Sequence, residues 1–255
     1  MIRNVTTALQ FLTIFTVKKD HEVDEKGLAR SMTYFPLVGF LIGLLLVWAD
    51  RVLLRLFPDT ISNVVLLLLA ALITRGLHID GLADSVDGIT GGRDAASRLA
   101  IMKDSRIGTA GVLAILFVQL IKYACLNNLF YDYKTAALLT APAFGRWSQM
   151  LMMFKAGYVR EQGLGSAFVG HVRWGGLAIA TVVAVGLSGF VIFQYDLRTA
   201  MLAIGTPLAV ALFTVLWRWF VVRRTGGVTG DPVGAVSEMN EALTLLLFVF
   251  LLSER

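Results

Sequence analysis

The sequence predicts an all-α protein built as a bundle of membrane-spanning helices. Of its 255 residues, 56% are hydrophobic and 16% are charged, whereas soluble domains carry about 25% charged residues. The apolar residues fall in long blocks with few ionisable side chains, which is the pattern of helices that face lipid. Because no internal repeat is visible, we expect a single domain over residues 1–255.

Seven apolar blocks are candidates for membrane-spanning helices. The fifth block has no charged residue and is the clearest. Several others are shorter than the roughly 20 residues that a span needs, so their helices must extend into flanking residues or be broken. Ahead of the blocks, residues 1–17 lack a cleavage site, which indicates a retained interfacial helix. The blocks are Phe35 to Leu54, Ile61 to Thr74, Ala110 to Leu126, Thr135 to Phe154, Gly175 to Phe193, Thr199 to Val222, and Ala242 to Leu252.

Alternate threading of these blocks places most basic residues on one side of the membrane. The loops on that side include residues 75–106, 155–173 and 218–241, whereas the other side has Arg51, Arg55, Lys134, Arg198 and Arg255. The positive-inside rule makes the richer side cytoplasmic, and we expect a multi-pass protein of the cytoplasmic (inner) membrane. The net charge of +5 is spread over several loops, so we expect no nucleic-acid partner.

The segment from Thr74 to Gly88 carries the strongest chemical signal. Asp80, Asp84 and Asp87 are spaced i, i+4 and i+7, so a helix would place their carboxylates along one face. Like charges at that spacing repel one another unless a cation neutralises them, and carboxylate oxygens suit Mg²⁺ or Mn²⁺. Asp-Gly pairs are also common in turns, so helix caps in a solvated turn are the alternative. The register of the aspartates beside an apolar block favours a divalent-cation site.

A second polar segment precedes the third apolar block. Lys103 and Arg106 can bind phosphate, arginine through two parallel hydrogen bonds. Asp104 is a further candidate metal ligand, and the helix that follows would offer its N-terminus to an anion. A positively charged membrane anchor explains the same residues without a ligand. This segment alone leaves both interpretations open.

A third polar segment runs from Gly226 to Glu241. Asp231 precedes Pro232, which predicts a helix N-cap followed by proline in the first turn. The start of that helix can face a phosphate or a metal ion, and Glu238 lies seven residues further along the same side. Carboxylates near the membrane, such as Glu238 and Glu241, need a partner. Capping alone explains Asp231 but leaves the glutamates unexplained.

Three more residues are candidates for the same site. Arg160 lies in a glycine-containing loop and carries a weak signal for phosphate binding. Arg146 falls inside the fourth apolar block, and because a cation in lipid is costly we expect it to face a polar cavity. His78 is two residues from Asp80, and we expect a hydrogen-bonding residue there, with ligation as the alternative.

These motifs resemble those of the cobalamin synthase family, also called adenosylcobinamide-GDP ribazoletransferases. They occur in the family's order, and the likeness extends from Phe35 to Glu241. One departure is Arg75, where the family usually has glycine in a turn. The matching motifs are His78-Ile-Asp-Gly-Leu-Ala-Asp-Ser-Val-Asp-Gly88, Met102-Lys-Asp-Ser-Arg-Ile-Gly108, Glu161-Gln-Gly-Leu-Gly165 and Thr229-Gly-Asp-Pro-Val-Gly-Ala235.

The resemblance implies the last step of nucleotide-loop assembly in cobalamin (vitamin B12). In that reaction adenosylcobinamide-GDP and α-ribazole, or its 5′-phosphate, give adenosylcobalamin, or its 5′-phosphate, and GMP. The resemblance also implies Mg²⁺ as the cofactor and a cytoplasmic-membrane location. Besides these substrates and the lipid bilayer, other enzymes of the corrinoid pathway are candidate partners.

The candidate residues suit that chemistry. A sugar hydroxyl must attack a pyrophosphate phosphorus, and metal ions and basic side chains would stabilise the anionic transition state. One carboxylate would accept the proton from the hydroxyl. The predicted roles are metal binding by Asp80, Asp84, Asp87, Asp104 and Asp231, phosphate binding by Lys103, Arg106 and Arg160, catalysis by Asp84 with Asp87 or Glu238 as proton acceptor, and supporting positions for His78, Arg146 and Glu241.

Two other function classes remain open from the sequence. A CDP-alcohol phosphotransferase also uses a multi-aspartate motif at a membrane face, but it has Ala-Arg after Asp-Gly where this chain has Ala83 and Asp84. A secondary transporter would place its ionisable residues near mid-membrane, whereas these acidic clusters lie at block ends. A structural scaffold is the weakest alternative because it does not need aligned carboxylates.

Overall fold

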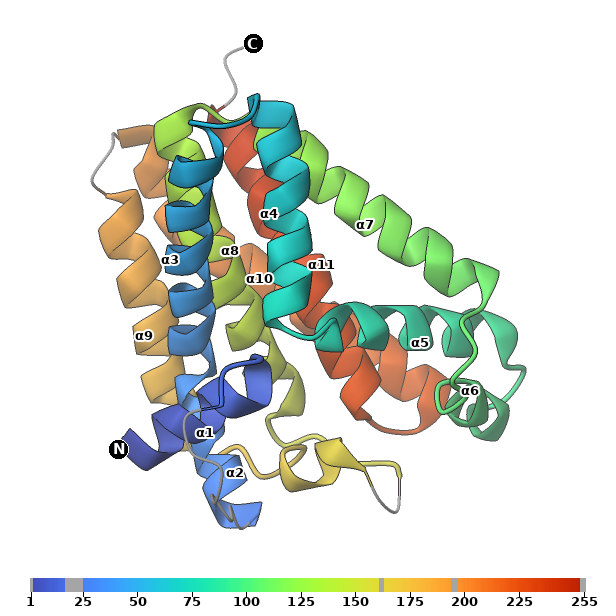
Figure 1. The fold of residues 1–255 in the computed structure, drawn as a ribbon. Coiled ribbons are helices and arrows are strands. Elements are labelled where there is room, and N and C mark those ends of the chain that lie inside the picture. The colour runs from blue at the N-terminus through green and yellow to red at the C-terminus, as the bar shows by residue number, and fades with distance from the viewer. Residues whose placement is uncertain (1, 17–24, 161–162, 194–196, 253–255) are drawn as a thin grey trace.

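The computed structural model describes residues 2–16, 25–160, 163–193 and 197–252 (Figure 1). The described residues form helices joined by turns and loops, with one isolated bridge between Tyr158 and Val228. The prediction of an all-α fold is confirmed. The elements are α1 (Ile2–Leu12), α2 (Glu25–Ser31), η1 (Met32–Tyr34), α3 (Phe35–Leu53), α4 (Asp59–Ile73), α5 (Leu77–Gly91), α6 (Ala95–Ile101), α7 (Thr109–Asn127), α8 (Tyr131–Met153), η2 (Leu164–Ala167), α9 (Trp174–Ile192), α10 (Leu197–Thr225) and α11 (Gly230–Leu252).

Each of the seven predicted apolar blocks forms a helix, and the chain is a polytopic helical membrane protein. Among the described residues, however, only five helical segments, or six with the α4–α5 pair, are long and apolar enough to cross a membrane, and α8, the fourth block, is not one of them. The short last block shows how the missing length is supplied, because α11 begins at Gly230 and not at Ala242. α4 and α5 reach the length and apolarity of a span only as a pair, and they are bent by 88°. Within the described residues, the helical segments that pass this test unaided are Gly27–Leu53, Thr109–Asn127, Trp174–Ile192, Met201–Thr225 and Gly230–Leu252.

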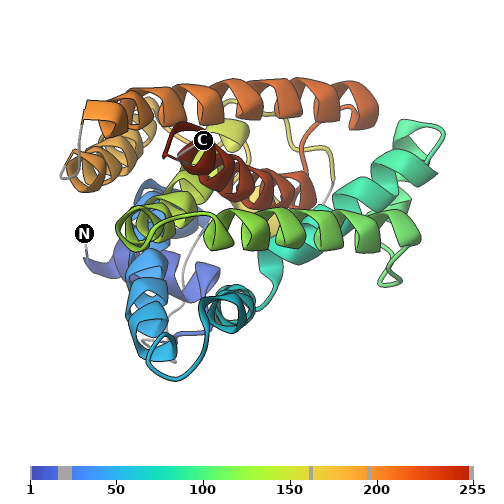
Figure 2. The ribbon, with the colours of Figure 1, turned by 90° about the horizontal axis from the view of Figure 1, so that it is seen from above.

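α8 is the central helix of the bundle. Every residue from Ala136 to Met150 is buried, and α3, α9, α10 and α11 pack around α8. Because protein rather than lipid surrounds it, α8 can carry Lys134, Arg146 and Gln149, which would be costly on a lipid-facing helix. Seen from above, α11 lies between α10 and α7, while α5 and α6 extend away to one side (Figure 2).

The helices α3 and α8 approach closely because α3 carries glycines at their contact. A Cβ atom at Gly39 would lie 2.2 Å from the backbone oxygen of Pro142, and one at Gly43 would lie 2.5 Å from that of Leu138. Small residues at such crossings let two backbones pack directly, which is a main source of helix association in membranes. The contact fixes the position of α8 and of the polar side chains that it carries.

We therefore expect Gly39→Ala to destabilise the protein. The added methyl group must force α3 and α8 apart, and overpacking of this kind costs about 1–3 kcal/mol or more. The thermal unfolding midpoint of the detergent-solubilised protein measures the effect. Gly186→Ala in α9 is the matched control, because a Cβ atom there meets nothing within 4 Å. Equal midpoints for the two variants would contradict this packing account.

A buried ion cluster joins α3, α4 and α8 at the end of the bundle far from α5. Lys134 Nζ lies 2.8 Å from Asp50 Oδ1 and 2.6 Å from Asp59 Oδ1. The side chains of Lys134 and Asp50 are each 2% exposed. Lys134 is therefore a buried structural cation near the start of α8 that alternate threading of the blocks assigns to the less basic side.

The turn between α4 and α5 directs α5 across the bundle end. Arg75 has φ 54° and Gly76 has φ 66°, the left-handed region that costs a non-glycine residue about 1–2 kcal/mol. This is a physical reason to expect glycine at the position of Arg75. In this chain Arg75 Nη2 donates to the backbone oxygen of Phe11 at 3.2 Å, and the Ile14 amide donates to Ile73 O at 2.8 Å. These bonds hold α1, the predicted N-terminal helix, against the turn, and α5 runs at an angle of 88° to α4 (Figure 1).

Candidate active site

Glycines bring α5 and α11 into backbone contact. A Cβ atom at Gly81 would lie 2.7 Å from Asp231 O, and one at Gly234 would lie 3.3 Å from the Cα atom of His78. The conformational tolerance and small size of glycine permit this approach. The crossing places Asp80 of α5 and Asp231 of α11 on the wall of one cavity. The first and last sequence motifs thus meet, as the prediction of a common site requires.

A short loop pairing adds Arg160 to this crossing. The Val228 amide donates to Gly157 O at 2.9 Å, and the Val159 amide donates to Val228 O at 3.3 Å. The pairing positions Arg160 so that its Nη2 lies 2.7 Å from Asp231 Oδ2. Glu161, the next residue of the predicted motif, lies outside the described residues.

Asp231 does not act as the N-cap that the Asp-Pro pair predicts. α11 begins one residue earlier, at Gly230, so Asp231 already lies in the first turn. Its carboxylate accepts from Arg160 and, at 3.3 Å, from Thr229 Oγ1. The side chain is thereby directed to the α5 crossing and away from the backbone amides of its own helix.

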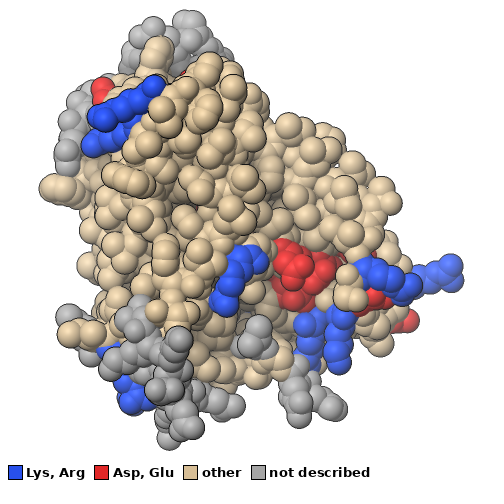
Figure 3. All heavy atoms as spheres, viewed as in Figure 1, with Lys and Arg blue, Asp and Glu red and all other residues tan. Residues whose placement is uncertain are grey.

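A cavity of about 220 Å³ opens at this crossing, and we refer to it as the aspartate cavity. Its lining combines Asp80, Arg160 and Asp231 with several aromatic and aliphatic side chains. Acidic side chains form a compact patch at this end of the molecule, with basic side chains on both sides of it (Figure 3). The described lining is Phe11, Phe35, Leu77, His78, Asp80, Gly81, Gln149, Met153, Tyr158, Arg160, Gly165, Phe168, Val169, Gly230, Asp231, Val233 and Gly234.

Asp84 lies one helical turn after Asp80, and the negative charge of neighbouring carboxylates affects its pKa. Burial, followed by the neighbouring carboxylates of Asp80 and Asp231, raises the pKa of Asp84 to about 7 against the opposing effect of Arg160. A carboxyl group with this environment favours a cation beside it, because its ionised form is otherwise destabilised. We refer to Asp80, Asp84 and Asp231 as the carboxylate cluster.

Asp87 faces a different element, the start of α7. Its Oδ2 accepts from the Gly108 amide at 2.7 Å, and its Oδ1 accepts from the Gly111 amide at 2.8 Å. Cβ atoms at Gly108 and Gly111 would lie 2.5 and 2.4 Å from this carboxylate, so only glycine leaves room for it. The helix N-terminus predicted to bind an anion therefore binds the chain's own Asp87.

Asp104 and Arg106 form an exposed pair near the same helix start. Arg106 Nη2 lies 2.6 Å from Asp104 Oδ2, and hydrogen bonds from the Arg106 side chain and backbone lower the pKa of Asp104 to about 2. Both residues line a shallow, open hollow of about 470 Å³ together with Asp87. Lys103 is exposed on the same segment. These residues lie outside the aspartate cavity, at a neighbouring position on the same face.

The predicted glutamates belong to a second, buried set of charges. Lys122 Nζ lies 2.6 Å from Glu238 Oε2 and 2.7 Å from Glu241 Oε2. Arg146 pairs with Glu241 through Nη1 and Oε1. These four residues, which we call the buried ion network, line a separate narrow cavity of about 40 Å³. Arg146 and the two glutamates thus have charged partners in the structure, but Glu238 does not line the aspartate cavity.

His78 connects the two regions. It is 1% exposed and lines the aspartate cavity, and its Nδ1 lies 3.4 Å from Arg146 Nη2. Hydrogen bonding, as predicted, is thus one role of His78.

Lys122 and Gln149 were not singled out in the sequence. The sequence contains a signal for both, because a lone lysine or glutamine inside an apolar block needs a polar partner.

The carboxylate cluster suits a magnesium ion that also binds substrate. In the described ranges, no three His, Cys, Asp or Glu side chains are grouped closely enough to hold a metal ion by themselves. Mg²⁺ usually takes only one or two protein carboxylates and completes its shell with water and substrate phosphate oxygens. The unneutralised charge around Asp84 fits that mode of binding.

Comparisons with known proteins agree with the motifs. The family described as cobalamin-5-phosphate synthase matches residues 4–249. The chain is 38% identical to the adenosylcobinamide-GDP ribazoletransferase of Geotalea daltonii, covering 98% of each chain. It is 35% identical to the protein of that name from Clostridioides difficile, over 96% of this chain and 95% of the relative. No solved structure matches the chain. The resemblance seen in the sequence is confirmed, and the chain belongs to the cobalamin-5-phosphate synthase family.

Proposed function

We propose that this chain is an adenosylcobinamide-GDP ribazoletransferase. It transfers the adenosylcobinamide phosphate group of adenosylcobinamide-GDP to α-ribazole, or to α-ribazole 5′-phosphate, and releases GMP. Relatives with that name match it over nearly their full length. The structural observation that carries the proposal is the carboxylate cluster with Arg160 at the end of a membrane-embedded helix bundle.

The reaction exchanges one phosphorus–oxygen bond for another. The acceptor hydroxyl forms a bond to the phosphorus that carries the corrinoid side chain, the bond from that phosphorus to the GMP oxygen breaks, and the hydroxyl proton passes to a carboxylate of the cluster, such as Asp84. When bound, Mg²⁺ would neutralise the pyrophosphate and stabilise the leaving oxygen. Asp80, Asp84 and Asp231 are the candidate ligands, and one or two of them would hold it together with substrate phosphate oxygens.

Basic side chains at this face would bind the rest of the substrate charge. Arg160 lies at the cavity wall with its guanidinium on Asp231, where it can exchange one carboxylate contact for a phosphate oxygen. Lys103 and Arg106 are exposed on the neighbouring segment and can contact the outer phosphate. A displacement reaction of this kind depends mostly on positioning and charge stabilisation.

We assign positioning roles to the two predicted proton acceptors. Asp87 caps α7 through both carboxylate oxygens, so it fixes the helix start beside the cluster. Glu238 is paired with Lys122 in the buried ion network, and we do not propose it as the proton acceptor. Asp104 lies opposite Arg106 and would hold that arginine near the phosphate groups.

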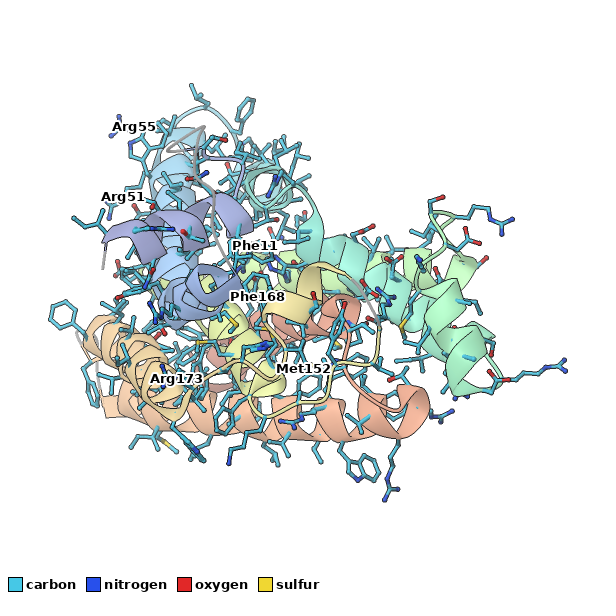
Figure 4. The ribbon with its side chains drawn as sticks, turned by 90° about the horizontal axis from the view of Figure 1, so that it is seen from below. Phe11, Arg51, Arg55, Met152, Phe168 and Arg173 are labelled. Atoms are coloured by element: carbon cyan, nitrogen blue, oxygen red, sulfur yellow. The ribbon has the colours of Figure 1, made fainter. Side chains whose placement is uncertain are left out.

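We place the site at the cytoplasmic face of the inner membrane. Basic residues are numerous around α5, α6 and the ends of α8 and α10, as in Arg93, Arg98, Lys155 and Arg224. At the other end, basic residues are fewer, for example Arg51 and Arg55 near the end of α3 (Figure 4). The positive-inside rule supports this orientation.

Product analysis with the detergent-purified protein tests the proposed function. With adenosylcobinamide-GDP and α-ribazole present together with Mg²⁺, we expect GMP and adenosylcobalamin in equal amounts. Omitting either substrate should stop the release of GMP. Release without an acceptor would indicate a hydrolase, and no release with α-ribazole or its 5′-phosphate would contradict the proposal.

A further inference from the structure

Two buried polar atoms in the lining of the aspartate cavity have no hydrogen-bond partner among the described residues. They are His78 Nε2 and Gln149 Oε1, and their residues are 1% and 3% exposed. Leaving such a group unpaired in the interior costs about 1–3 kcal/mol. Because both residues line the same cavity, a ligand in it can satisfy both.

The two atoms differ in hydrogen-bonding character. Arginine only donates, so the contact of Arg146 Nη2 with His78 Nδ1 makes Nδ1 an acceptor and places the ring proton on Nε2. His78 thus presents a donor, whereas Gln149 Oε1 is an acceptor. A hydroxyl group both accepts and donates, so ligand hydroxyls match this pair.

Aromatic rings line the same cavity. The rings of Phe11 and Phe35 are stacked with centroids 5.9 Å apart, and Phe168 lies 4.6 Å from Phe11 and 6.1 Å from Phe35. Figure 4 shows Phe11 of α1 close to Phe168, which follows η2. Flat aromatic walls favour a flat ligand that can stack or pack edge-to-face against them.

Size and charge narrow the choice of ligand. The cavity of about 220 Å³ is smaller than the roughly 300–1,000 Å³ usual for pockets that bind drug-sized ligands, which favours a small ligand part. Arg160 is the one cation among its described lining residues, and it is already paired with Asp231. The part of the lining formed by Phe11, Phe35 and Phe168 carries no charge. It therefore suits an uncharged ligand part with a flat ring and hydroxyl groups, which is the chemistry of a nucleoside.

We propose that the aspartate cavity is the subsite for the acceptor nucleoside. Its base packs against Phe11, Phe35 and Phe168, and its ribose hydroxyls bond to His78 Nε2 and Gln149 Oε1. The acceptor is then held beside Asp80 and Asp231, where the phosphoryl group is transferred. This assignment rests on the proposed function. The guanosine of the donor has related chemistry, and the experiment distinguishes the two nucleosides.

Direct binding of α-ribazole to the detergent-purified protein, measured by calorimetry without any corrinoid, tests the subsite. Gln149→Met removes the acceptor at similar size, and Phe168→Leu removes a ring but keeps an apolar side chain. Each should weaken α-ribazole binding by at least about 10-fold, which corresponds to about 1.4 kcal/mol, and leave GDP binding unchanged. Phe190→Leu on α9 is the matched control, because Phe190 is 71% exposed and away from the cavity.

The outcomes separate the subsite from the reaction. Weaker GDP binding with unchanged α-ribazole binding would assign the cavity to the donor nucleotide and overturn the proposal. Unchanged binding of both ligands, or no binding of α-ribazole to the unmodified protein, would also overturn it. Since binding is measured without turnover, a failure of the transferase proposal appears separately, as absent GMP release. The unfolding midpoint of each variant confirms that it is folded.

Discussion

Replacing Asp84 with alanine is expected to lower GMP release by on the order of 10²–10³-fold, the loss seen when one transition-state-stabilising group is removed. Asp84 lies in the carboxylate cluster and interacts with Asp80, Asp231 and Asp87, so its loss removes a ligand and the charge that would attract a cation. Asp84→Asn keeps the shape of the side chain and should be nearly as inactive. The initial rate of GMP release measures both variants.

The same variants should still insert into the membrane, because Asp84 makes no ion pair in the described structure and α5, with 15 residues, is too short to span the membrane by itself. Asp132→Ala is the matched control, since Asp132 is an exposed carboxylate in the first turn of α8. It should leave turnover unchanged. Full turnover by Asp84→Ala, with normal amounts in the membrane fraction, would remove the carboxylate cluster from the mechanism.

Lys122→Met is expected to destabilise the protein by about 3–5 kcal/mol, the range for breaking a buried ion pair from one side. The lysine side chain is 6% exposed and neutralises two carboxylates, those of Glu238 and Glu241. Its loss leaves Glu238 with only Gln119, which lies 3.3 Å away. Thermal unfolding in detergent should show a lower midpoint, and the yield of folded protein should fall.

A second substitution tests the cause of that loss. Lys122→Met combined with Glu238→Gln removes the unpaired charge, while Arg146 remains paired with Glu241. The double variant should therefore be more stable than Lys122→Met alone, which is the coupling expected of interacting residues. A Lys122→Met protein as stable as the unmodified one would show that the buried ion network does not stabilise the fold.

The helices and the polar face could be predicted because both depend on local sequence. Long apolar blocks specify helices, and the spacing of Asp80 and Asp84 places them on one face of α5. The glycines at positions 81 and 234 had no such local signal. Their role is to let α5 and α11 touch, which depends on how two distant helices cross.

Long-range pairing is also why several predicted site residues have other partners. Asp87 faces α7 and Glu238 faces Lys122 because of the rotation of whole helices in the bundle, and helical periodicity does not determine that rotation between segments. The subsite lining could not be predicted for a related reason. Phe11, Gln149 and Phe168 come from three separate segments, and only the folded chain brings them together.

The need for a divalent cation at the carboxylate cluster is tested most directly by following GMP release against free Mg²⁺ for the unmodified protein and for Asp80→Asn. We expect no release in excess chelator, and we expect Asp80→Asn to require about 10–100-fold more Mg²⁺ for half-maximal rate, the range typical of weakened metal sites. Turnover that persists in chelator, or the same Mg²⁺ dependence for both proteins, would contradict a cation site at Asp80, Asp84 and Asp231.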